Sequence, residues 1–215
     1  VVGNGGINMR TKDGGITWKD SAFVSENKDY NSISISNSFK EFSIGGNGYL
    51  AFKAYLSGTP IISSFLLGDN YFSVITLSKL HRWFVGAGGL IEKWDSGSSS
   101  FNIVKLLKGN NNTILSSDFI NNRTGYFTST SGRLYKTTDA GENWKYKNTY
   151  YSGINLYGIS FPSEDVGFVC GDSGKISKTM NGGTNWTKQT SGVNSLLFSI
   201  SFIDTQSGWS CGDIG

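Results

Sequence analysis

The chain has 215 residues and a formal net charge of +3, with 16% charged and 14% aromatic residues. The low charge content excludes intrinsic disorder, and the small positive surplus does not favour a nucleic-acid-binding protein. Two cysteines and one histidine, His81, are too few for a zinc site of the usual ligand spacing. No apolar run is long enough to predict a transmembrane helix.

The first predicted elements lie within residues 1–20. This segment begins with a short apolar strand, continues through a glycine-rich turn into another strand, and ends in the hydrophilic stretch Thr11–Trp18. The Asp13 side chain can hydrogen-bond to backbone N–H groups that follow it, and Gly15 can adopt a positive φ without a Cβ clash. We therefore expect a turn between two strands, with Trp18 packed at the edge of the sheet.

Strands with alternating apolar residues are predicted at five places farther along the chain. A second short strand follows each of them and carries a large aromatic residue at one position, where we expect burial. The first strands contain Ile33 and Ile35, Val74 and Thr76, Ser117 and Phe119, Ile159 and Phe161, and Ile200 and Phe202. The aromatic positions are Phe42, Trp83, Tyr126, Phe168 and Trp209.

The stretch Thr11–Trp18 has two close relatives nearer the C-terminus, and we call the three stretches cassettes. Their defining residues are Thr11, Asp13, Gly15 and Trp18; Thr137, Asp139, Gly141 and Trp144; and Thr179, Asn181, Gly183 and Trp186. We expect a structural role for them, because a functional site rarely needs three equivalent copies.

Two places where a cassette is expected have lost it. Pro60 stands in for the tryptophan at one of them, and Ser96 and Phe101 stand in for the aspartate and the tryptophan at the other. The predicted strands on either side persist, so we expect the same sheets with altered outer turns.

The chain repeats itself at regular intervals, and the equivalent marker positions are Gly3, Gly45, Gly86, Ser129, Gly171 and Gly212. Four short strands in a unit of about 40 residues are typical of a β-propeller blade, so we predict an all-β fold with one domain over residues 1–215. Two arrangements fit this spacing: a five-bladed ring, which we favour, and a fragment of a seven-bladed propeller.

The cassettes resemble the Asp-box, also called the BNR repeat. The longer unit is similar to the propellers of the photosystem II assembly and stability factor type, and this similarity extends over essentially the whole chain. The resemblance implies a propeller, typically with seven blades, that acts through a protein partner. Similar units occur in many secreted bacterial proteins, which implies an extracellular or periplasmic location. The chain starts at Val1 rather than at Met, as expected after removal of a targeting segment.

The uniform repeat, with no catalytic constellation, predicts a non-enzymatic binding or scaffold module that needs no cofactor or metal. The alternative is a carbohydrate-binding or sialidase-like, glycoside-hydrolysing propeller, because Asp-boxes are common in such enzymes. A glycosidase needs two carboxylates that face each other across a cleft. Among the acids, Asp118 stands apart because it lies in a predicted first strand, and we favour a solvated or hydrogen-bonded carboxylate there.

Four basic residues share the position just before the cassettes or their replacements: Arg10, Lys93, Lys136 and Lys178. We favour side chains that extend over apolar neighbours and end in solvent, and the alternative is a docking surface for an anionic partner. Cys170 and Cys211 also occupy equivalent positions in neighbouring repeats, and we expect two free, buried thiols.

Overall fold

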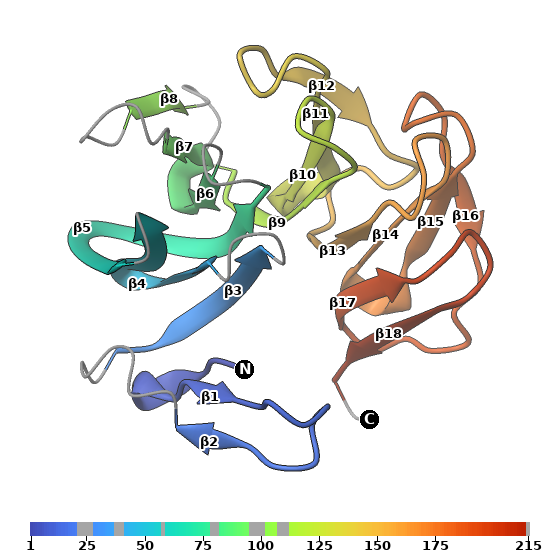
Figure 1. Cartoon of the computed structure of the whole chain (residues 1–215). Helices are drawn as coiled ribbons and strands as arrows, with labels where there is room; N and C mark the ends of the chain where they lie inside the picture. The colour runs from blue at the N-terminus through green and yellow to red at the C-terminus, as the bar shows by residue number, and fades with distance from the viewer. Residues whose placement is uncertain are drawn as a thin grey trace. The chain divides into compact units, whose positions relative to one another are not determined.

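The structure is a computed structural model that describes residues 1–20, 28–36, 41–56, 59–77, 82–94, 102–106 and 112–213. His81 and the altered turn with Ser96 and Phe101 lie outside these residues. The chain forms two compact units: Val1–Ala87 with Ile91–Ile103, and Gly88–Leu90 with Val104–Gly215. Every described regular element is a β-strand or a single turn of 3-10 helix, which confirms the predicted all-β fold (Figure 1).

The described part of the first half of the chain forms two sheets. The hairpin β1 (Met9–Arg10) and β2 (Lys19–Asp20) forms a two-stranded sheet around the first cassette. The other strands form one antiparallel sheet in chain order: β3 (Tyr30–Ser36), β4 (Glu41–Leu56), β5 (Thr59–Thr76), β6 (Arg82–Gly86), β7 (Leu90–Trp94) and β8 (Asn102–Leu106).

We number the repeats along the chain, with residues 1–20 as the first. The second repeat, which begins with β3, departs from the predicted four short strands. Its second and third strands are fused into β4, and its fourth strand continues into the next repeat as β5. Leu56 pairs with Thr59, so a two-residue connection replaces the longer cassette turn, and the pairing extends back to Asn47 and Asn70. The outer turn is altered as predicted, but the prediction that this repeat keeps four short strands is wrong. Without the cassette, continuous backbone pairing lengthens both strands.

The marker glycine of this repeat is also one residue away from its predicted position. Tyr30 pairs with Gly46, as Leu156 pairs with Gly171 in the fifth repeat. A Cβ on Gly171 would lie 2.0 Å from the carbonyl oxygen of Asn155, and a Cβ on Gly46 would make an equally close approach to the backbone. Gly46, not Gly45, therefore occupies the place where two strands approach too closely for a side chain.

The second half of the chain forms two complete four-stranded antiparallel sheets, as predicted for propeller blades. The strands of each sheet follow chain order, as seen in the yellow-green to orange part of Figure 1. The fourth repeat consists of β9 (Ile114–Phe119), β10 (Gly125–Ser129), β11 (Arg133–Thr137) and β12 (Lys145–Asn148). The fifth consists of β13 (Leu156–Ser160), β14 (Gly167–Gly171), β15 (Ile176–Thr179) and β16 (Thr187–Gln189). They are followed by the hairpin β17 (Leu197–Phe202) and β18 (Gly208–Gly212).

A 3-10 turn joins the second and third strands in four repeats. The turns are η1 (Asn4–Gly6), η2 (Ala87–Gly89), η3 (Thr130–Gly132) and η4 (Asp172–Gly174). The middle residue of each has a positive φ, including Ser131 at 66° and Ser173 at 55°. The same left-handed turn therefore recurs with either glycine or serine at its centre.

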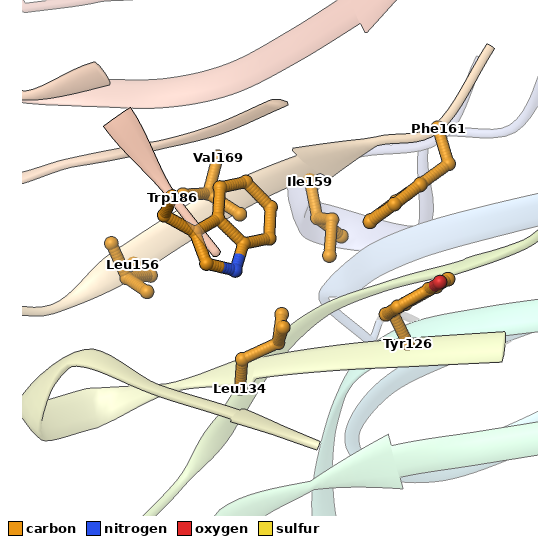
Figure 2. Packing of buried hydrophobic residues seen from close by; sticks show 7 residues of the cluster. All are labelled: Tyr126, Leu134, Leu156, Ile159, Phe161, Val169 and Trp186. Carbon is orange, nitrogen blue, oxygen red and sulfur yellow. The ribbon is translucent and has the colours of Figure 1, made fainter. Parts of the chain in front are cut away.

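A hydrophobic core joins the fourth and fifth repeats. Phe161 stacks on Tyr126 with their ring centroids 3.8 Å apart, and Trp186 meets Phe161 edge to face at 6.1 Å. Figure 2 shows the cluster as side chains that converge from both sheets: Tyr126, Leu134, Leu156, Ile159, Phe161, Val169 and Trp186. Burial of this apolar surface from water holds the two sheets together.

The aromatic residues of the second strands follow the predicted burial with one exception. Trp83, Tyr126 and Phe168 are buried, whereas Trp209 is 67% exposed. The prediction for Trp209 is wrong because, among the described strands, β18 pairs only with β17, so no further strand of its sheet flanks it. The side chain of Phe42 lies outside the described part of the structure.

Candidate functional site

The cassette side chains form a compact hydrogen-bonded turn. In the fourth repeat, the Thr137 hydroxyl donates to Asp139 at 2.7 Å and accepts from the backbone N–H of Gly141 at 2.8 Å. Asp139 also accepts from the backbone and side-chain N–H groups of Asn143, both at 2.9 Å. These hydrogen bonds, led by the backbone one from Asn143, lower the pKa of Asp139 to about 2. Its carboxylate is therefore ionised and engaged in the turn.

The other two cassettes share this arrangement. Asp13 accepts from the backbone N–H of Thr17 at 2.9 Å, and hydrogen bonds led by the Thr17 side chain lower its pKa to about 2. In the fifth repeat, Asn181 takes the place of the aspartate and accepts from the backbone N–H of Asn185 at 2.8 Å. An amide oxygen suffices at this position, because the turn needs an acceptor rather than a charge.

The fourth repeat also helps to hold the cassette of the fifth repeat in place. The Gly182 carbonyl accepts from the Tyr126 hydroxyl at 3.0 Å and from Nζ of Lys136 at 2.8 Å. The Gly182 N–H donates to the Asp165 carbonyl at 2.9 Å, within the same repeat. The cassette therefore takes part in the packing of one sheet against the next.

Three of the four predicted basic positions lie over aromatic rings. Lys136 Nζ is 5.1 Å from the centroid of Tyr126, its direct partner across the β10–β11 ladder. Lys93 lies over Trp83 at 5.4 Å and Lys178 over Phe168 at 5.2 Å, in the same cross-strand relation. The fourth, Arg10, is exposed on β1. This geometry favours cation–π packing for the three lysines, and a docking role for the four residues stays a prediction.

Asp118 bridges two repeats. Its Oδ2 accepts the backbone N–H of Phe161 at 2.6 Å, one repeat farther along the chain. The Ser160 hydroxyl oxygen accepts the backbone N–H of Phe202 in the same way at 3.0 Å, and that of Ser34 accepts the backbone N–H of Thr76 at 2.9 Å. Burial raises the pKa of Asp118 to about 6, although the two backbone hydrogen bonds oppose this rise. Asp118 therefore serves as the ionisable member of a series of contacts between first strands.

The two cysteines are free thiols in different environments. Cys170 is buried and its Sγ lies 3.5 Å from the Leu197 carbonyl oxygen, whereas Cys211 is exposed. The prediction of two buried thiols is therefore wrong for Cys211. It lies on β18, which pairs only with β17 among the described strands.

This contrast predicts a difference in thiol reactivity. Burial raises the pKa of Cys170 to about 12, so almost no thiolate is present at pH 8. We expect one thiol per folded chain to react rapidly with Ellman's reagent at pH 8, and a second to react only after denaturation. The variant Cys211→Ser should lose the rapid phase. Two rapid thiols in the folded chain would contradict the burial of Cys170.

A polar cavity of about 350 Å³ lies in the second unit. Its walls come from Ser173 and Gly174 of the turn η4, the end of β16, the loop 190–194 and Tyr151 from the preceding repeat. Lys175 and Lys188 line it, and none of its lining residues is acidic. Lys175 lies over the Tyr151 ring, with Nζ 5.8 Å from its centroid. The sequence analysis did not single out these residues, because they belong to no recurrent motif.

The equivalent place in the fourth repeat is arranged differently. Arg133 is the counterpart of Lys175 one repeat earlier, and it lies 5.8 Å from the centroid of Tyr146, the counterpart of Lys188. The side-chain amide of Asn112 faces the guanidinium of Arg133. With the amide oxygen turned toward the arginine, it accepts hydrogen bonds from Nε at 3.0 Å and from Nη1 at 2.9 Å. A comparison of equivalent positions in successive repeats could have revealed that the fifth repeat has two lysines where the fourth has an arginine and a tyrosine.

Comparison with known proteins places the chain in a family. The family model described as photosynthesis system II assembly factor YCF48 matches residues 72–180, just over half of the chain. A search of curated proteins gives no match. Among the described residues, no helix is long and apolar enough to cross a membrane.

Several solved structures are similar to this chain. A YCF48 structure bound to D1 peptide has a TM-score of 0.52 and 16% identity, over 98% of this chain and 85% of that one. YCF48 from Cyanidioschyzon merolae has a TM-score of 0.51 and 17% identity, over 98% and 87%. The WD40 repeats of RRP9 have a TM-score of 0.70 and 10% identity, over 92% and 63%. These similarities confirm the β-propeller fold, and the number of blades stays a prediction. The family match over more than half of the chain shows that the chain belongs to the photosynthesis system II assembly factor YCF48 family.

Proposed function

We propose that the chain is a non-enzymatic propeller module that binds a partner protein outside the cytoplasm. The observation that carries this proposal is that the side chains repeated along the chain make their contacts within the protein itself. The cassette oxygens accept local hydrogen bonds, and Lys93, Lys136 and Lys178 pack on aromatic rings. A partner is therefore best accommodated by residues that do not repeat. Membership in the YCF48 family, which includes a structure bound to D1 peptide, supports a polypeptide as that partner.

The environment of Asp118 supports a non-catalytic role for this acid. A raised pKa is a property of a general acid, and in a glycosidase such an acid acts with a second carboxylate across a cleft. Here the rise comes from burial, and Oδ2 is occupied by the backbone N–H of Phe161. Such an arrangement suits a contact between repeats. None of the similar structures reported above adds support to the carbohydrate alternative.

The surface that best fits a partner is the cavity beside η4. It combines two lysines with hydroxyl and amide side chains, and most of its lining comes from the turn η4 and the loop that follows the strand β16. Loops carried on a rigid β framework are common places for binding residues. We place the partner's contact here, with the other loops of the fifth repeat beside it.

The proposed function can be tested with arrays. The purified chain is expected to bind a subset of unstructured peptides on a peptide array, and to show neither retention on a glycan array nor hydrolysis of glycoside substrates. Fractionation of the full-length gene product should place it outside the cytoplasm. Glycoside turnover that Asp118→Asn abolishes would contradict the proposal, as would a chain that binds glycans and no peptide.

A further inference from the structure

The cavity beside η4 brings two positive charges to one place without a negative charge. Lys175 follows the turn at its carboxyl end, and Lys188 lies on β16, where its backbone pairs with Ser177. Both line the cavity, and its other lining residues are uncharged. Like charges that line one cavity favour an anion or solvent between them, because they repel each other.

The fourth repeat shows how the same position is satisfied without a ligand. There, a single cation, Arg133, lies beside the Tyr146 ring and the Asn112 amide. At the equivalent positions of the fifth repeat, Lys188 replaces the tyrosine and Ile154 replaces the asparagine. Ile154 packs against the hydrophobic core between the repeats, so it offers Lys175 no acceptor. The change therefore adds a charge and removes the amide acceptor, while Lys175 keeps an aromatic contact with Tyr151.

The remaining walls suit a small polar group. Tyr151 supplies a ring beside Lys175, and its hydroxyl is buried with no hydrogen-bond partner among the described residues. Ser191 and Asn194 add a hydroxyl and an amide to the lining. The cavity of about 350 Å³ has room for a carboxylate with the residue that carries it, and not for a folded domain. Basic side chains bind carboxylates through charge-assisted hydrogen bonds, which are stronger than neutral ones.

We propose that this cavity receives a carboxylate of the partner polypeptide, held between the ammonium groups of Lys175 and Lys188. The inference rests on the proposed function and specifies the chemistry of its contact. The fifth repeat then differs from the fourth because an external carboxylate takes the place of the internal amide acceptor. The carboxylate comes from the partner's C-terminus or from an acidic side chain, and these two sources share the same recognition chemistry.

Four short peptides with a common neutral sequence distinguish the two sources. The first has a free C-terminal carboxylate, the second a C-terminal amide, and the third and fourth are amides with one internal Glu or Gln. Each is titrated into the ¹⁵N-labelled chain while the amide resonances of residues 173–194 are followed. We expect saturable shifts with one or both carboxylate peptides, weakening as salt is raised, and none with the two neutral peptides.

Charge variants test the role of the lysines. The double variant Lys175→Gln with Lys188→Gln is expected to weaken carboxylate binding by about tenfold or more, because it removes both charge-assisted contacts. The charge-preserving variant Lys175→Arg with Lys188→Arg should retain binding. Lys188→Tyr, which recreates the tyrosine of the fourth repeat, should weaken it. Lys145→Gln removes an exposed lysine from another repeat and is the matched control, with unchanged binding expected.

The outcomes separate this inference from the proposed function. Peptides that bind on the array but whose affinity is unchanged in the double glutamine variant would overturn the carboxylate site and leave the partner-binding function intact. Equal shifts with neutral and carboxylate peptides would also overturn it. A chain that binds no peptide in either assay would contradict the proposed function itself.

Discussion

Replacement of Trp144 by alanine is expected to lower the free energy of unfolding by about 3–5 kcal/mol, the usual range for a large buried aromatic. The Trp144 side chain is 7% exposed and stacks on Phe127 with ring centroids 4.0 Å apart. It also meets Phe119 edge to face at 6.1 Å. Its removal leaves a cavity between rings that are fixed by strands on both sides. Urea unfolding followed by far-UV circular dichroism measures the loss.

The first cassette provides a control for this variant. Trp18 occupies the same cassette position but is 46% exposed. Trp18→Ala should therefore change the free energy of unfolding by less than about 1 kcal/mol, as is usual for exposed positions. Equal losses for Trp18→Ala and Trp144→Ala would contradict this explanation. The cassette tryptophan would then stabilise the fold through its own turn and not through packing against the sheet.

Asp118→Asn is expected to stabilise the chain at pH 8 and to leave its stability nearly unchanged at pH 3. The pKa of Asp118 is about 6 in the folded chain, compared with 3.8 for the unperturbed group. A folded-state pKa that is raised gives a stabilising contribution that is complete below pH 3.8 and is lost as the pH rises through 6. The neutral amide avoids this loss and can still accept the Phe161 N–H. The difference at pH 8 is at most about 3 kcal/mol.

Unfolding curves between pH 3 and pH 8 test this expectation. Ser160→Ala is the matched control, because Ser160 makes the equivalent contact to Phe202 without a titratable group. It should cost about 1 kcal/mol at every pH, as is typical of a lost hydrogen bond. If the wild-type chain and Asp118→Asn share one stability profile over this range, Asp118 is not buried as the structure has it.

Local interactions made much of the fold accessible from the sequence. The hydrogen bonds that Thr137 and Asp139 make or accept span only two to four residues along the chain, so the spacing of these residues already specifies the turn. The regular interval between the marker positions likewise identifies a repeated four-stranded unit, because the interval can be read from the sequence alone. The sheets of the fourth and fifth repeats follow this prediction in order and direction.

The sequence was less informative about strand lengths, because these depend on pairing between strands as well as on the local pattern. The loss of the cassette around Pro60 was evident, but the fusion of neighbouring strands into β4 and β5 was not. Strand length depends on the partner strand as much as on the segment itself. The same reason explains the marker in the second repeat, where register with Tyr30 rather than glycine spacing selects Gly46.

The sequence by itself determined the class of fold, its repeat, and the turns that its cassettes form, because these depend on contacts between near neighbours. Only the tertiary structure decided which members of each repeated set differ in environment. It buried Trp144 and left Trp18 exposed, joined Asp118 to Phe161, and brought Lys175 and Lys188 to one cavity. Equivalent residues carry the same local signal in a repeat protein, and the neighbours that they meet across sheets and loops set their burial, their charge and their availability to a partner.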